Sequence, residues 1–121
     1  MAKIFKTTEG SRVTKKEAME WINKYDQQMR LDKEKDTKSI FYGRDALLNL
    51  LSQEGSAGIT FFLASRYEEA AKKETVQLVL VATTEDGKLL WGDDGVSTQK
   101  TGEGGSGVFD KGAPCPPYCP T

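Results

Sequence analysis

The chain has 121 residues, of which 37% are hydrophobic and 29% are charged, and this composition predicts one domain with a modest core. Its 17 basic and 18 acidic residues leave a formal net charge of −1, so no overall field attracts the chain to nucleic acid or to an anionic membrane surface. No apolar run reaches the length of a signal-peptide core or a membrane span. We therefore expect a cytoplasmic protein without nucleic-acid or membrane partners.

The first predicted element is a helix that begins after Thr14. Thr14 and Glu17 have the spacing of a capping box, in which each side chain accepts a hydrogen bond from the other residue's amide. Apolar residues then recur at helical spacing, which predicts a helix whose apolar face docks on a sheet. Aromatic residues in such a stripe could line a ligand pocket, but they belong to a core far more often. The stripe consists of Ala18, Trp21, Ile22, Tyr25 and Met29.

A charged segment and a second helix follow. Residues 30–38 alternate basic and acidic side chains, which is typical of a solvated link, and a docking patch for a charged partner is less favoured because the charges nearly cancel. Residues 40–42 are expected to be extended. The leucine-rich segment 44–53 predicts a helix that ends near Gly55, because glycine accepts the left-handed conformation common at helix C-termini.

Two strands, 59–64 and 76–84, are predicted to pair. The first alternates apolar and aromatic side chains between two faces, and the second is too apolar to have a solvated face, so we expect cover on both of its sides. The connection 65–74 is expected to form an exposed helical turn or an extended charged loop. Asp-Gly at 86–87 predicts a two-residue type I′ turn into a third strand, 88–91.

The composition changes after Trp91. The stretch to Asp110 is rich in glycine and polar residues, with only Val96, Val108 and Phe109 to bury, so it is either a linker or a loop pinned by those three residues. We therefore divide the chain into a core domain, residues 1–92, and a Gly-rich segment with a Pro/Cys tail, residues 93–121. The aspartates at 86, 93 and 94 lack the register of a calcium-binding loop.

The tail is the most unusual motif, because it holds all four prolines and both cysteines. Its two thiolates could form half of a zinc site, or they could be a redox pair with a spacing one residue wider than Cys-x-x-Cys. A Pro-rich strip that a partner grips is the favoured interpretation, and an inert tail is the remaining alternative. The candidate binding residues are Pro114, Cys115, Pro116, Pro117, Tyr118 and Cys119, with no metal-ligating residue assigned.

Several of these motifs together resemble a group of small bacterial proteins of unassigned function. The resemblance covers most of the chain from Ser39 onward and implies that core and tail belong to one unit, without implying an activity, a cofactor or a catalytic residue. It rests on Phe41-Tyr42-Gly43-Arg44-Asp45, on residues 53–59, on Leu78-Val79-Leu80-Val81 with the following Asp-Gly, and on the closing Pro-Cys-Pro-Pro-Tyr-Cys-Pro.

The residue inventory disfavours catalysis. Histidine is absent, so Ser-His and Cys-His pairs are impossible, and no spacing forces two carboxylates into one cleft. We predict an α+β fold in which two N-terminal helices pack on a small antiparallel sheet, followed by a Gly-rich and Pro/Cys tail.

Three strands leave an edge and an apolar side uncovered, which pairing with a second copy would remedy. The predicted function is a non-catalytic binding or interaction module without a cofactor, with a protein partner or a homodimer. The alternative is a small metal-binding or thiol-redox protein that acts through Cys115 and Cys119.

Overall fold

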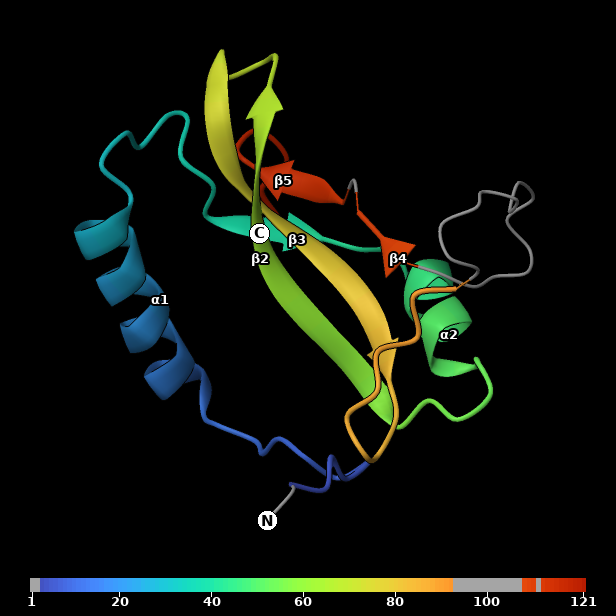
Figure 1. Ribbon diagram of the computed structural model, residues 1–121. Coiled ribbons are helices and arrows are strands. Elements are labelled where there is room, and N and C mark those ends of the chain that lie inside the picture. The colour runs from blue at the N-terminus through green and yellow to red at the C-terminus, as the bar shows by residue number, and fades with distance from the viewer. Residues whose placement is uncertain (1–2, 93–107, 111) are drawn as a thin grey trace.

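The computed structural model describes residues 3–92, 108–110 and 112–121. Within these residues the chain forms a small α+β fold with antiparallel pairing, as the sequence predicted (Figure 1). The strands form two sheets, β1-β5 and β2-β3-β4, where the sequence predicted one. The elements are α1 (Lys15–Met29), β1 (Ser39–Phe41), α2 (Arg44–Leu51), β2 (Gly58–Glu68), β3 (Lys73–Thr83), β4 (Val108–Phe109) and β5 (Ala113–Cys115).

A long hairpin is the centre of the fold. β2 and β3 pair from Gly58 opposite Thr83 to Glu68 opposite Lys73, so both strands run through the segment that was expected to be a helical turn or a loop. Lys72, with φ of 60°, provides the left-handed residue that closes the tip. The expectation holds at the tip, where the Lys72 N–H donates to the Glu68 carbonyl at 2.7 Å and forms one turn. It was wrong for residues 65–68 and 73–74, because the ladder continues outward from an apolar centre, whereas local ion pairs add only a few tenths of a kcal/mol to a helical turn.

β3 is covered on both faces where it is most apolar. Leu80 and Ala82 are 0% exposed and pack with Leu50 of α2. Val81, which points to the opposite face by strand alternation, is also 0% exposed. The predicted cover on both sides is therefore confirmed at this end of the strand. Toward the hairpin tip it is wrong, because Val76 is 43% exposed.

Four different partners close the outer edge of β3. Alternate residues of an antiparallel strand direct their backbone groups to the same side, and four successive residues on that side of β3 each find a partner. The Thr37 and Tyr42 hydroxyls donate to the carbonyls of Val76 (2.9 Å) and Leu78 (2.6 Å), β4 pairs at Leu80, and the Leu90 N–H donates to the Ala82 carbonyl (2.9 Å).

The segment after β3 differs from the predicted third strand over 88–91. One isolated bridge joins Thr83 to Leu89, and β4, far along the chain, pairs with β3 instead. The turn differs as well, because Gly87 has a positive φ of 88° and Asp86 does not. This is the geometry of a longer hairpin loop with glycine at its left-handed position, and a type I′ turn would need positive φ at both residues.

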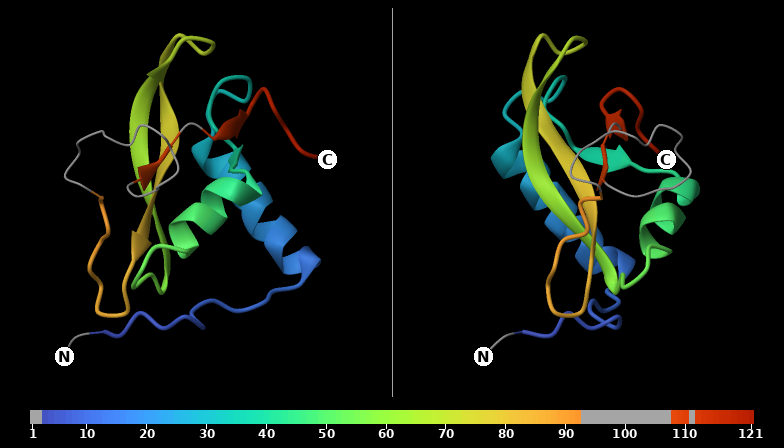
Figure 2. Two further views of the ribbon diagram at one scale, coloured as in Figure 1. Left: turned by 90° about the vertical axis from the view of Figure 1, so that its right-hand side faces the viewer. Right: turned by 45° about the vertical axis from the view of Figure 1, so that its right-hand side comes forward.

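α1 forms as predicted but does not join the core. The Glu17 N–H donates to Thr14 Oγ1 at 3.0 Å and the Thr14 N–H donates to the Glu17 carboxylate at 3.3 Å, which completes the capping box. No residue of α1 is buried, and Trp21 and Met29 are 56% and 64% exposed, so the core interpretation of the stripe is wrong. α1 lies on the same face of the hairpin as α2 (Figure 2, left). Neither of these two helices combines the length and apolarity needed to cross a bilayer.

Most of the predicted Gly-rich segment, residues 93–107 with Val96 and the aspartates at 93 and 94, lies outside the described residues. The division of the chain after residue 92 therefore stays a prediction. Val108 and Phe109, which one of the two predicted alternatives has pinning this segment, form β4 against β3.

Candidate functional site

The Pro/Cys tail folds back onto the body as a closed loop. β5 pairs antiparallel with β1, and the Lys38 N–H donates to the Cys115 carbonyl at 2.6 Å. A disulfide joins Cys115 to Cys119, and the Tyr118 N–H donates to the Pro114 carbonyl at 2.9 Å across the loop. The tail was predicted as a Pro-rich strip that a partner grips, and the structure shows a short strand followed by a tight loop.

The disulfide determines what the two cysteines can do. Joined sulfurs carry no thiolate, so in this form neither Cys115 nor Cys119 can ligate a metal or act as a nucleophile. Among the described residues no group of three or more Cys, Asp or Glu side chains is arranged to hold a metal ion. The bond spans four positions of sequence and therefore restrains the loop rather than the core.

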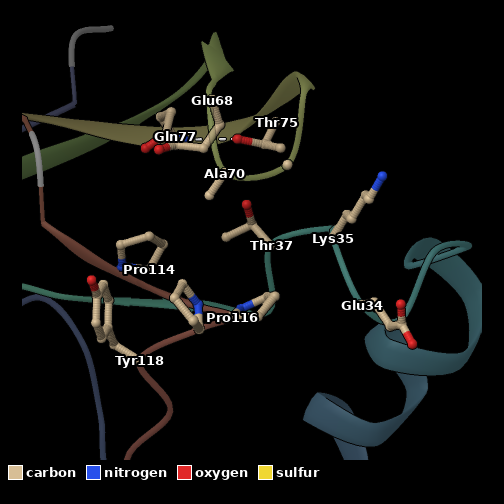
Figure 3. Close-up of a pocket in the computed structure, with 12 residues that line it drawn as sticks. Glu34, Lys35, Thr37, Glu68, Ala70, Thr75, Gln77, Pro114, Pro116 and Tyr118 are labelled. Atoms are coloured by element: carbon tan, nitrogen blue, oxygen red, sulfur yellow. Dashed lines mark hydrogen bonds between the residues drawn. The ribbon is translucent and has the colours of Figure 1, made fainter.

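A pocket of about 260 Å³ lies between this loop and the tip of the hairpin (Figure 3). We call it the tail pocket. Three parts of the chain line it: the segment after α1, the hairpin tip and the tail. Of the predicted site residues, Pro114, Pro116, Pro117 and Tyr118 line the pocket, whereas Cys115 and Cys119 close the loop that presents them. The other lining residues are Glu34, Lys35, Thr37, Glu68, Ala70, Ala71, Thr75 and Gln77.

The floor of the tail pocket is polar and buried. Gln77 and Thr75 are 3% and 7% exposed. The Gln77 amide nitrogen donates to Thr75 Oγ1 at 2.9 Å and to the Glu68 carboxylate at 3.4 Å, while its oxygen accepts from Arg66 at 3.1 Å. These contacts hold the amide in one orientation. The Thr75 hydroxyl accepts from the Gln77 amide, which is not a base and cannot activate it as a nucleophile.

The opposite wall is apolar. Figure 3 shows Pro114, Pro116 and Tyr118 facing the side of the pocket that holds Gln77 and Thr75. Tyr118 is 64% exposed, so its ring is available to a ligand at the mouth of the pocket. The proline rings add a rigid apolar surface, and an exposed aromatic ring on such a wall is typical of grooves that bind extended or proline-containing peptides.

An ion pair joins two walls of the tail pocket. Lys73 Nζ at the hairpin tip lies 2.7 Å from Asp36 Oδ1, in the segment after α1. The hydrogen bond from Lys73 lowers the pKa of Asp36 below its usual value, and the same bond raises the pKa of Lys73. Each group therefore stays charged across the neutral range, as expected for a structural tie and not for a proton-transfer group.

The floor of the tail pocket was not predicted from the sequence. Thr75 and Gln77 both belong to β3. The expected strand began only at Val76 and therefore left out Thr75, whereas Gln77 was interpreted as part of a central strand. Gln77 did carry a signal, because it is the single polar residue in the apolar run 76–82. A buried amide in such a run needs hydrogen-bond partners, and those partners mark a polar site.

Comparisons with known proteins give no match: no family model matches the chain, and neither curated proteins nor solved structures do so. The resemblance to small bacterial proteins with a Pro-Cys-Pro-Pro-x-Cys-Pro tail therefore stays a prediction. The chemistry and shape of the tail pocket are therefore the features from which a function can be inferred.

Proposed function

We propose that the protein is a non-catalytic interaction module that binds a protein partner through the tail pocket. The observation that carries the proposal is the convergence of three separate chain segments on one pocket with an apolar proline and tyrosine wall and a buried amide floor. Four of the six predicted binding residues lie in that wall.

The size of the tail pocket favours an anchor side chain over a whole small molecule. Its volume of about 260 Å³ is below the range of roughly 300–1,000 Å³ typical of small-molecule sites. Interfaces often place one apolar or aromatic anchor of a partner in such a pocket, with the remaining contacts around it. The anchor would pack on Pro114 and Pro116, with the exposed ring of Tyr118 covering it.

Substitutions at the mouth of the tail pocket test the proposal. Peptides are selected against the wild-type protein from a random phage-displayed library, and their affinities are then measured by fluorescence polarisation. Tyr118→Ala should weaken binding by roughly 30-fold or more, the cost of losing an aromatic anchor contact. Pro117→Ala should also weaken it, whereas Pro120→Ala, outside the pocket, should not. Failure to enrich any peptide, or equal affinity for Tyr118→Ala, would refute the proposal.

The alternative, thiol-redox action through Cys115 and Cys119, remains a second proposal because the two sulfurs are within bonding reach. The reduction potential of this disulfide distinguishes a structural bond in an interaction module from a redox-active pair. A value below about −300 mV is typical of a structural bond, whereas about −270 to −120 mV is typical of redox-active pairs. The cytoplasmic location stays a prediction, and the disulfide weighs against it because such bonds persist mainly in oxidising compartments.

A further inference from the structure

Among the described residues no strand lies on the outer side of β2, which is therefore an open edge of the larger sheet. The even-numbered residues of β3 direct their backbone groups to the outer edge described above, so the odd-numbered residues of β3 bond to the even-numbered residues of β2. The odd-numbered residues of β2 therefore direct their N–H and C=O groups outward. An edge of this length is a template for another strand. These residues are Ile59, Phe61, Leu63, Ser65 and Tyr67.

The same edge is unusually apolar. Phe61, Leu63 and Tyr67 are 52%, 79% and 49% exposed. Leu63 also lines a groove of about 400 Å³ that separates the hairpin from α1, which we call the α1 groove. Its helix side consists of Trp21, Ile22 and Tyr25.

The exposed apolar surface is large enough for a stable interface. With about 150–250 Å² for a large side chain, the exposed fractions in this region amount to roughly 700 Å² per chain, close to the ~800 Å² that each partner contributes to a standard interface. A monomer rarely leaves such an area to solvent. The side chains concerned are Trp21, Ile22, Tyr25, Met29, Phe61, Leu63 and Val76.

We propose that a second copy of this chain covers the surface, with its β2 antiparallel to β2 of the first copy about a two-fold axis at Leu63. Leu63 is the midpoint of Gly58–Glu68, so this register pairs the whole strand. Leu63 directs its backbone groups to the open edge, and the two copies can therefore exchange both hydrogen bonds at the axis. The two three-stranded sheets join into one continuous sheet.

The side chains fit this register. Charged residues meet uncharged ones, since Arg66 lies opposite Thr60 of the other copy and Glu68 lies opposite Gly58. Like charges directly opposite would have opposed the pairing. The two phenylalanines meet small residues, with Phe61 opposite Ser65 and Phe62 opposite Ala64.

α1 gains a role in this arrangement. Figure 1 shows α1 on the side of the hairpin away from β4, and Figure 2 places it on the helix-bearing face, so the added strand runs beneath its apolar stripe. Side chains of the second copy then fill the α1 groove. This explains why Trp21 and Tyr25 form an apolar stripe although neither is buried within one chain. A strand from an unrelated protein would offer no such matched register on both sides.

A charge-swap experiment on the full chain tests this inference independently of the tail pocket. Sedimentation equilibrium at about 100 µM should show a dimer for the wild type, and Leu63→Lys and Leu63→Glu should each raise the dissociation constant by at least 30-fold through like charges at the axis. An equimolar mixture of the two variants should restore the dimer. Leu48→Lys is the matched control, because Leu48 is 53% exposed on α2 and does not line the α1 groove, so this change should leave the dimer intact.

Three results would overturn the inference: a monomeric wild type, a dimer that Leu63→Lys leaves unchanged, or a mixture of the two variants that stays monomeric. Circular dichroism of each variant checks that the loss of the dimer is not caused by unfolding. Leu63 is 79% exposed, so its replacement should not disturb the fold. A monomeric wild type that binds strand-forming peptides at this edge would assign the edge to a different partner and would also refute the second copy.

Discussion

Replacement of Leu50 by alanine measures how strongly α2 is held on the sheet. Leu50 is 0% exposed and packs against Leu80 and Ala82. Leu50→Ala removes three buried carbon atoms, which at about 0.8 kcal/mol each corresponds to about 2.4 kcal/mol of transfer free energy. The cavity left behind raises the expected loss in the free energy of unfolding to about 3–5 kcal/mol. At about 4 °C per kcal/mol, Tm should fall by roughly 12–20 °C.

The neighbouring residue supplies the control. Leu51 lies in the same helix and is 47% exposed, so Leu51→Ala removes the same atoms at about half the burial and should cost only about 1 kcal/mol. Urea unfolding followed by far-UV circular dichroism measures both losses, at one fixed protein concentration because association would add to the apparent stability. Equal losses for the two variants would refute the assignment of Leu50 to the core.

Three further predictions concern the contacts around the tail and the sheet edge. Gly112→Ala should lower the free energy of unfolding by about 1–3 kcal/mol in thermal melts, because its Cβ would lie 2.7 Å from a backbone oxygen, whereas Gly58→Ala, with nothing within 4 Å, should not. Tyr42→Phe should cost about 0.5–1.5 kcal/mol in urea unfolding by removing the hydroxyl that donates to a β3 carbonyl, and an unchanged midpoint would contradict this. The ion pair between Asp36 and Lys73 stabilises the fold above the ordinary carboxyl pKa of 3.8, and this contribution is lost as pH falls through the lowered pKa of Asp36. It is likewise present below the ordinary lysine pKa of 10.5 and lost as pH rises through the raised pKa of Lys73, so Tm measured against pH should fall at both extremes by more than in Asp36→Asn.

Local sequence patterns predicted the elements whose signals are local. The capping box at Thr14 located the start of α1, the leucine run located α2, and the apolar run 76–82 located the centre of β3. The position of α1 relative to the sheet was not accessible in this way. An apolar stripe shows that a face needs cover, and it does not show whether the same chain provides that cover.

The remaining strands could not be predicted because they are short. β4 and β5 have two and three residues, too few for periodicity, and their places depend on which backbone groups of β3 and β1 lack a partner. Proline is uncommon in strands because it lacks an N–H, yet β5 with Pro114 is an edge strand in a two-stranded sheet, where a missing N–H is tolerated.

One wall of the candidate site could be predicted from the sequence. Composition alone drew attention to Pro114, Pro116, Pro117 and Tyr118, and these residues do line one pocket. The remaining lining comes from the segment after α1 and from the hairpin tip. The tip was not predicted because β2 and β3 extend past the expected strand ends and leave only a single turn between Glu68 and Lys72.

The mixed set of groups that closes the outer edge of β3 also limits growth of the sheet. Within the described residues, two hydroxyls, a two-residue strand and a single amide occupy the outer edge of β3, so β2 offers the long edge at which a further strand can pair. If a symmetric mate pairs with β2, the joined sheet has six strands and ends at both edges in the two-residue β4. Such short edges offer few backbone groups to another chain, which disfavours growth into fibrils.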